Sequence, residues 1–424
     1  MKALLATRRF LPLFLTQFLG AFNDNVFKNA LVMFVTYKVA SSEAGNAQVL
    51  VVMAGALFIL PYFLFSATAG QVADKYDRAF LARVTKVWET IIVAIAAMGF
   101  YMGNALFLLL VLFCLGVQAT FFGPIKYALL PQHLREEELL SGNAYIEAGT
   151  FLAILLGTIC GGLLIMSEQG THLIALAMIS CALGGYMASR HIPTAPAPMP
   201  ALKLNWNIAT ETWKMVKRDY ASRRVFASIL GISWFWLVGA TFLSQFPAYA
   251  KNYAHADETV VTLFLTVFSV GIGIGSFLCN WLLQGEIKTT YVAWAALGIS
   301  LFTLDLYVAS AVLTPLGDGR LMTAAQFLGG MVQWRILCDM LMIAVCGGIY
   351  IVPLYAVMQH DSEPEYRART IASNNVINAA FMVAAALLTV AMLAMQRTIP
   401  DIFLSLGIAN MGVVWFARKF TRPA

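Results

Sequence analysis

The sequence predicts an all-α membrane protein in which twelve transmembrane helices form two pseudo-symmetric six-helix bundles. Three observations predict this fold: the high content of apolar residues, the length of the apolar runs, and a repeat on either side of a central linker. Of the 424 residues, 60% are hydrophobic and 12% are charged, and the mean hydropathy is +0.75. Soluble globular chains carry about 25% charged residues, so this composition indicates an integral membrane protein.

The apolar runs are long enough to cross a membrane as helices. A spanning helix needs about 20 apolar residues, and the alternating segments of about ten residues that form transmembrane β-barrels do not occur in the sequence. The first run is too long for the apolar core of a signal peptide, so we interpret it as an uncleaved first span. The predicted spans lie near residues 10–38, 47–72, 80–102, 104–130, 139–167, 171–190, 224–250, 259–283, 286–309, 334–359, 366–396 and 398–418.

Positive charges predict the orientation, because Lys and Arg accumulate in short loops on the cytoplasmic side of a membrane. With both termini in the cytoplasm, 21 of the 28 Lys and Arg residues fall in cytoplasmic segments and four fall in outer loops (Lys38, Lys251, Arg320 and Arg397). We therefore predict a multi-pass protein with both termini inside. The formal charge of +6 is explained by this excess of cytoplasmic Lys and Arg, which also attracts anionic membrane lipids as partners. It does not indicate nucleic acid as a partner.

The chain divides near its middle. RHIPTAPAPMPALKLNWN (190–207) is the only proline-rich stretch. We interpret residues 191–223 as a cytoplasmic linker that joins an N-terminal six-helix bundle (1–190) to a C-terminal six-helix bundle (224–424).

An internal repeat supports this division. Residues 123–148 match residues 352–379 in layout, and the offset of 229 to 231 is a little over half the chain. Transporters built from two such repeats bind their substrate between them, near the middle of the membrane. The matched pairs are Pro124 with Pro353, Asn143 with Asn374, and Glu147 with Asn378.

The stretch LGAFNDNVFKNALVMF (19–34) places polar residues in the middle of the first span. An ionised side chain costs about 2.5–3.5 kcal/mol at the centre of a span, so such residues usually face a protein interior or a water-filled cavity. At about 100° per residue, Gln17, Asp24 and Lys28 form a stripe that Asn25 widens. We predict that this stripe lines a cavity for a head group or a cation. The alternative is a self-neutralised Asp24–Lys28 pair that only helps helix packing.

Further polar positions fall on the fourth, fifth and eleventh spans. Asn143 and Glu147 share one face of the fifth span, and Lys126 stands near the end of the fourth. The corresponding residues of the second half, Asn374 and Asn378, are neutral. We therefore predict a cavity with charges on one wall and only neutral hydrogen-bonding groups on the other. For Lys126 the alternative is a side chain that snorkels to the membrane surface.

Three segments resemble known transporters. GQVADKYDR (70–78) resembles the signature of the major facilitator superfamily, with Asp77 in place of the usual glycine and Ala79 in place of a basic residue. QFLGAFNDN (17–25) and residues 123–164 resemble the bacterial lysophospholipid transporter family.

The resemblance implies the major facilitator fold and transport of lysophospholipids across the bacterial inner membrane. It places Asp24 in a family motif, and it implies that Asp74 and Arg78 hold the cytoplasmic gate closed; the alternative for these two is a plain solvated loop. Members of the family are associated with, or fused to, an acyltransferase. No enzyme domain follows the last predicted span, so we expect any acyltransferase to be a separate partner.

Further ionisable groups lie within or at the ends of predicted spans. Glu89 lies about ten residues inside the third span, where we favour a structural pair with Lys86 over a gate or proton site. Arg335 and Asp339 are four residues apart, which predicts a local pair, and Asp305 is expected at the membrane interface.

The sequence leaves several functions open. Sparse polar positions among many Phe, Met and Leu residues fit a lysophospholipid, which has a polar head and one acyl chain, and rocking of two halves would flip it toward the cytoplasmic leaflet. A proton-coupled exporter of hydrophobic cations is the first alternative, with Asp24 or Glu147 as the titrating group. A receptor or scaffold is the second. An enzyme is the weakest reading, because the five histidines and six cysteines show no spacing typical of metal ligands or a catalytic triad. We expect no catalytic residues, metal or cofactor.

Overall fold

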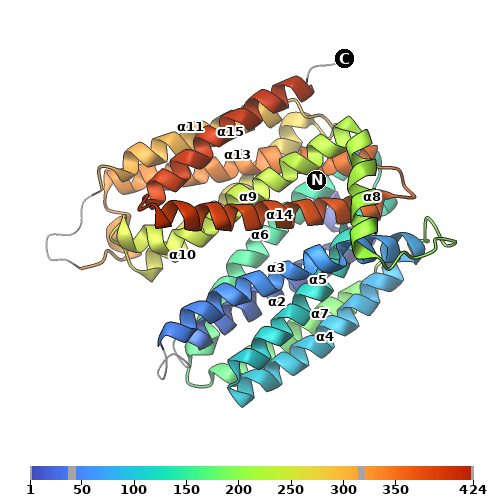
Figure 1. Cartoon of the computed structure of the whole chain (residues 1–424), viewed down its shortest axis with the longest axis horizontal. Helices are drawn as coiled ribbons and strands as arrows, with labels where there is room; N and C mark the ends of the chain where they lie inside the picture. Colours follow the sequence, from blue (N-terminus) through green and yellow to red (C-terminus); the bar gives the residue numbers. More distant parts are fainter. Residues whose placement is uncertain (1, 37–43, 314–319, 422–424) are drawn as a thin grey trace. The chain divides into compact units, whose positions relative to one another are not determined.

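The computed structural model describes residues 2–36, 44–313 and 320–421, so the predicted end of the first span at residue 38 lies outside the described residues. The predicted all-α class is confirmed, since the described residues form helices and one isolated bridge between Ala256 and Met322 (Figure 1). The helices are α1 (Lys2–Leu5), α2 (Leu11–Phe34), α3 (Ala44–Lys75), α4 (Arg78–Met102), α5 (Ala105–His133), α6 (Glu136–Met166), α7 (Gly170–Ser189), α8 (Ile208–Ala221), α9 (Arg223–Asn252), α10 (Glu258–Leu283), α11 (Val292–Ser310), α12 (Ala324–Phe327), α13 (Met331–Asp361), α14 (Arg367–Ala394) and α15 (Ile399–Thr421).

Ten of the described helices combine the length and the apolar composition of a membrane span. Two more, α2 and α4, have 24 and 25 residues, and at 1.5 Å per residue each is about 36 Å long. That length exceeds the roughly 30 Å of a hydrocarbon core. These two helices are less apolar because they carry charged and amide side chains within the span, and they contribute Asp24, Lys28, Lys86 and Glu89 to the site described below.

The outer faces of the helices carry large apolar side chains. Leu163 of α6, Leu176 of α7 and Leu387 of α14 are each at least 65% exposed. Exposed apolar surface of this extent is unusual in a soluble monomer, whereas lipid solvates it well. The helices therefore turn apolar side chains outward and enclose their polar ones.

The described residues form two compact units. The first, unit 1, comprises Met1–Gly142, Ala153–Phe226 and Gln359–Ala379, and the second, unit 2, comprises Asn143–Leu152, Ala227–Met358 and Ala380–Ala424. Each unit thus takes a segment from the other half of the sequence, and the two segments include two of the pairs matched by the repeat, Asn143 with Asn374 and Glu147 with Asn378. The predicted division at residues 191–223 concerns the two halves of the sequence and stays a prediction.

In unit 1, α2 packs on α7, α4 packs on α5 and α7, and α3 packs on α5. The core is aromatic at its centre, where Phe100 makes edge contacts with Phe27 and Phe34 at ring distances of 5.8 Å. Asp77 begins α4 by accepting a hydrogen bond from the Phe80 backbone N–H at 2.7 Å. Such a cap satisfies one of the free donors at a helix start and fixes where α4 leaves the α3–α4 turn.

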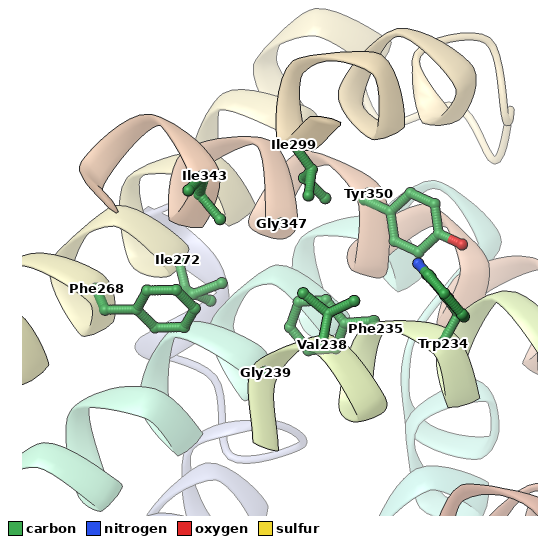
Figure 2. A pocket seen from close by; sticks show the side chains of 10 residues that line it. All are labelled: Trp234, Phe235, Val238, Gly239, Phe268, Ile272, Ile299, Ile343, Gly347 and Tyr350. Carbon is green, nitrogen blue, oxygen red and sulfur yellow. The ribbon is translucent and has the colours of Figure 1, made fainter. Parts of the chain in front are cut away.

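In unit 2, α11 packs on α15. The buried Asn410 of α15 accepts a hydrogen bond from the Trp234 indole N–H at 2.8 Å and donates to Ser300 at 2.9 Å. Beside it, side chains from α9, α10, α11 and α13 surround an apolar cavity of about 20 Å³ (Figure 2). That volume holds roughly one water molecule, so this cavity is closed to a lipid chain in the conformation described.

Candidate functional site

A buried ion pair lies at the centre of unit 1. The Lys86 ammonium and the Glu89 carboxylate of α4 are 2.5 Å apart, and both side chains are at most 1% exposed. Gln118 of α5 donates to the same carboxylate at 3.2 Å, and Asn23 of α2 donates to its other oxygen at 3.5 Å. The predicted pairing of Glu89 with Lys86 is confirmed. The partners from α2 and α5 were not predicted, because their spacing in the sequence does not relate them to α4.

The α2 stripe lies next to this pair. Asp24 is close enough to Lys28, Lys86, Glu89 and Lys126 for their charges to act on its carboxylate. Its oxygen Oδ1 is buried and has no hydrogen-bond partner among the described residues. Three ammonium groups and two carboxylates thus form one cluster with a net charge of +1.

Lys28 does not pair with Asp24 in the part of the chain that the structure describes. Its ammonium lies 4.4 Å from the centre of the Phe58 ring, a cation–π contact with α3. The self-neutralised pair considered from the sequence is therefore not formed. Asp24 and Lys28 still influence each other through their charges, but no direct ion pair joins them.

The neighbouring amides of α2 have local or structural partners. Asn25 donates to the Ala21 carbonyl at 2.7 Å, and Asn29 donates to Thr158 of α6 at 3.1 Å. Gln17 is buried on the same helix. Their part in substrate binding stays a prediction.

The first part of α14 belongs to unit 1, and it carries buried asparagines on a face near α5. The side chain of Asn374 is fully buried, and neither its oxygen nor its nitrogen has a hydrogen-bond partner among the described residues. The amide of Asn375 approaches Gly123 so closely that a Cβ at this glycine would lie 3.0 Å from it. Asn378 is buried one turn further along. Unpartnered buried amides are costly, and the part of Asn374 and Asn378 in substrate binding stays a prediction.

Asn143 and Glu147 belong to the α6 segment of unit 2, and both are fully buried. In the same unit, Tyr355 accepts a hydrogen bond from the Trp236 indole N–H at 3.0 Å. The predicted roles of Asn143 and Glu147 in substrate binding are not tested by these contacts and stay predictions.

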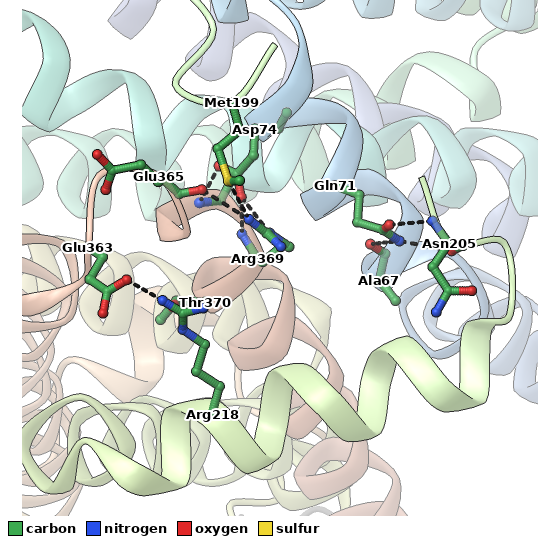
Figure 3. A network of polar contacts seen from close by, with 12 residues as sticks. Ala67, Gln71, Asp74, Met199, Asn205, Arg218, Glu363, Glu365, Arg369 and Thr370 are labelled. Atoms are coloured by element: carbon green, nitrogen blue, oxygen red, sulfur yellow. Dashed lines mark hydrogen bonds and ion pairs between the residues drawn. The ribbon is translucent and has the colours of Figure 1, made fainter. Parts of the chain in front are cut away.

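Asp74, at the end of α3, is the centre of a second polar network (Figure 3). One carboxylate oxygen accepts from Arg78 at 2.8 Å and from the Ala368 backbone N–H at 3.1 Å. The other accepts from the Arg369 guanidinium at 2.9 Å. All of these groups are buried. We call the contacts of Asp74 with Arg78, Ala368 and Arg369 the α3–α14 lock.

Gly70 of α3 allows α14 to pack closely against α3. A Cβ at Gly70 would lie 2.7 Å from the Cβ of Ala372 and 2.9 Å from the Cα of Arg369, so any larger residue would push α3 and α14 apart. The linker seals the same end of unit 1. The Met199 N–H donates to the Asp74 carbonyl at 2.9 Å, and the Arg78 N–H donates to the Ala195 carbonyl at 3.0 Å.

One predicted contact is wrong. Arg335 of α13 does not pair with Asp339 on its own helix; it binds both carboxylate oxygens of Asp305 on α11. A long arginine side chain reaches a neighbouring helix as easily as its own next turn. The i,i+4 rule of isolated helices therefore gave the wrong partner, and Asp305 is engaged in an ion pair.

The sequence profile described as Major Facilitator Superfamily matches residues 13–414. The chain belongs to this superfamily. As a major facilitator protein it is a membrane transporter rather than an enzyme, and the resemblance seen in GQVADKYDR is confirmed. The α3–α14 lock is built on that segment.

Named relatives of this major facilitator protein are similar over most of its length. The lysophospholipid transporter LplT of Serratia proteamaculans is 26% identical over 370 residues, covering 84% of this chain and 81% of that protein. The protein of the same name from Escherichia coli O9:H4 is 26% identical over 419 residues, covering 93% and 91%. The solved structure of the human organic anion transporter MFSD10 (TETRAN) superposes with a TM-score of 0.73 at 12% identity, covering 97% of this chain and 98% of that one. This likeness shows the fold.

Proposed function

We propose that this major facilitator protein flips lysophospholipids across the bacterial inner membrane, toward the cytoplasmic leaflet, by alternating access. The observation that carries the proposal is the charged cluster of Asp24, Lys28, Lys86, Glu89 and Lys126 in an otherwise apolar bundle, in which three amino groups outnumber two carboxyl groups and the Lys86–Glu89 pair is buried. Relatives named lysophospholipid transporter cover most of the chain. A lysophospholipid has an anionic phosphate, with or without an ammonium group, and one apolar chain, so it suits such a site.

In this proposal the head group binds at the charged cluster of α2, α4 and α5. Lys28 and Lys126 meet the phosphate, because ammonium groups bind phosphate as point charges. Asp24 takes the ammonium group of a zwitterionic head through its unpartnered oxygen. The asparagines Asn374 and Asn378 of α14 supply neutral hydrogen bonds, and the acyl chain stays against apolar side chains.

The α3–α14 lock is the proposed cytoplasmic gate. Asp74 and Arg369 join a helix of the first half of the sequence to a helix of the second half, so opening this side requires breaking their contacts. We place the lock and both termini on the cytoplasmic side because of the excess of Lys and Arg there. An acyltransferase that consumes the delivered lysophospholipid is proposed as a separate partner.

Reconstitution into vesicles tests the proposal. A lysophospholipid with a fluorescent acyl chain is added to the outer leaflet, and a membrane-impermeant quencher measures the fraction that remains outside. We expect that fraction to fall faster in vesicles containing the protein than in protein-free vesicles. If both fall at the same rate under every imposed ion gradient, the lipid-flipping proposal is rejected.

A proton-coupled exporter is the second candidate, favoured by the unpartnered carboxylate oxygen of Asp24. In that case a hydrophobic cationic dye should move against its gradient when a pH gradient is imposed, and the lysophospholipid should stay in its leaflet. The same vesicles decide between the two functions.

A further inference from the structure

A cationic cavity lies apart from the charged cluster of α2, α4 and α5, where the linker and α8 meet α3 and α14. Its volume is about 380 Å³, and its lining includes Lys203, Lys214, Arg218, Arg369, Glu211 and Tyr366. The lining comes from the linker, from α8 and from the start of α14, and Gln71 of α3 closes one side. All of these residues belong to unit 1.

The lining carries more positive than negative charge. Lys203 and Lys214 make no ion pair or hydrogen bond with any residue that the structure describes, and both are exposed to the cavity opening. Arg218 pairs with Glu363 at the rim. The single carboxylate of the lining, Glu211, accepts a hydrogen bond from the Asn205 amide at 3.2 Å. Two ammonium groups thus face the cavity without a counter-ion.

The two guanidinium groups are held in place by one aromatic ring. Arg218 and Arg369 lie 3.9 and 3.8 Å from the centre of the Tyr366 ring. Stacking on a ring face orients a guanidinium and limits its rotamers. The cavity therefore offers the remaining N–H donors of two oriented guanidinium groups and two exposed ammonium groups, the combination that recognises phosphate oxygens.

We infer that this cavity binds a phosphate group and that the bound phosphate stabilises the α3–α14 lock. The second part follows from Arg369, which lines the cavity and also donates to Asp74 at 2.9 Å. Opening the lock would displace Arg369 and dismantle the cavity. A ligand that binds only the locked state shifts the equilibrium toward that state, and the coupling is reciprocal. This inference does not depend on which substrate is transported.

The phosphate can come from a lipid head group or from a soluble phosphate compound. A lipid source is supported by the opposite face of α8 and the segment just before it, where Trp206, Trp213 and Tyr220 recur every seven residues and are each about 70% exposed. Trp and Tyr collect at the interface between membrane and water. Figure 1 shows α8 running across the end of α3, the direction expected for a helix on a membrane surface.

The test measures the unfolding temperature of the full chain. In a detergent without phosphate, inorganic phosphate is titrated against chloride at equal ionic strength. In parallel, the protein is placed in vesicles of phosphatidylcholine with or without phosphatidylglycerol. The double variant Lys203→Gln/Lys214→Gln removes the two free ammonium groups, and Lys217→Gln on the exposed face of the same helix is the matched control.

We expect phosphate to raise the unfolding temperature of the wild type and of Lys217→Gln, and the double variant to bind it about tenfold or more weakly. A rise with phosphatidylglycerol and not with inorganic phosphate assigns the site to lipid head groups; the reverse assigns it to soluble phosphate. Asp74→Asn should also weaken binding, although Asp74 does not line the cavity. Equal responses of the double variant and Lys217→Gln to both probes would overturn the phosphate site, and unchanged binding by Asp74→Asn would overturn the coupling.

Discussion

Lys86 and Glu89 show how this transporter keeps charges inside an apolar bundle. Removing two ions from water costs several kcal/mol for each, and a close, well hydrogen-bonded pair is needed to offset that cost. The 2.5 Å contact, together with the donors Gln118 and Asn23, meets this requirement. The pair joins α4 to its neighbours and also supplies two of the charges around Asp24.

Glu89→Ala should destabilise the protein strongly, because Lys86 would stay buried without a carboxylate. We expect the free energy of unfolding to fall by about 3–5 kcal/mol, measured by thermal unfolding in detergent. The exposed pair of Glu286 and Lys288 provides the control, and Glu286→Ala should cost at most about 1 kcal/mol. The double variant Lys86→Met/Glu89→Gln should recover much of the stability. Wild-type stability of Glu89→Ala would show that the pair is not structural.

Asp24→Asn should impair transport far more than folding. The carboxylate is not held in an ion pair with Lys28, so its loss removes a ligand contact and little packing. We expect the flipping rate of a zwitterionic lysophospholipid to fall about tenfold or more, the effect of ~1.4 kcal/mol, with an unchanged unfolding temperature. Asn29→Ala on the same helix is the control. A wild-type rate for Asp24→Asn at normal expression would remove Asp24 from the site.

At the scale of helices, the α3–α14 lock depends on one carboxylate that accepts bonds from two helices. Asp74 binds Arg78 at the start of α4 and the backbone and side chain of the first turn of α14. The close approach at Gly70 lets these groups meet without water between them. Under the proposed alternating-access cycle, these contacts would stabilise the conformation in which α3 and α14 are joined and would be absent from the other.

Asp74→Asn should weaken this lock. Loss of the charge leaves Arg78 and Arg369 close together without their shared counter-ion, and a loss of ~1.4 kcal/mol shifts a two-state ratio tenfold. Cysteines at Ala67 and Ala372, two members of the buried cluster that joins α3 and α14, report the shift by their crosslinking yield in a cysteine-free background. Asp77→Asn, which keeps a capping side chain for α4, is the control. Equal crosslinking yields in the wild type, Asp74→Asn and Asp77→Asn would mean that Asp74 does not hold the α3–α14 lock closed.

The docking of α8 should depend on pH. Burial raises the pKa of Asp219 to about 6 from 3.8, while the hydrogen bond from Thr370 at 2.9 Å and the charge of Arg218 act in the opposite direction. The docked helix thus holds a proton that the undocked helix releases. Docking is strongest below about pH 4 and weakens as the pH rises to about 6, by a total on the order of 3 kcal/mol.

Asp219→Asn should remove this dependence and protect α8 at neutral pH. An asparagine still accepts the hydrogen bond from Thr370 but carries no charge to bury. Amide hydrogen exchange of α8, corrected for the intrinsic effect of pH, measures the change between pH 4 and 7. The exposed Glu137→Gln variant should behave as the wild type. A variant that keeps the wild-type pH dependence would show that Asp219 is not the titrating group.

At the scale of the whole molecule, an ion gradient coupled to the proposed transport would set its direction. Glu147 is a fully buried carboxylate on α6, and the residue matched to it by the repeat, Asn378, is neutral. A charge present in one half only is the simplest place for a coupling cation or proton to act.

Glu147→Gln should therefore change the dependence of flipping on an imposed pH or cation gradient. We expect the variant to flip lipid at a rate that no longer responds to the gradient, because the amide neither titrates nor attracts a cation. The rate is measured in vesicles with the gradient imposed in each direction, and Glu137→Gln, an exposed carboxylate of the same helix, is the control. A gradient response equal to that of the wild type would leave Glu147 as a structural hydrogen-bonding group.

The sequence alone determined the helical membrane class, the spans and the polar stripe of α2, because hydropathy and helical periodicity are local properties that any packing must satisfy. Only the tertiary structure decided which distant residues meet. It brought Arg369 to Asp74 across 295 residues, gave Arg335 a partner on α11, and placed Asn23 and Gln118 on one carboxylate. It also left Asp24 and Lys28 unpaired although their spacing allows a pair. Such contacts depend on how helices cross and on where a glycine lets them approach, and neither is written in the spacing of residues along one helix.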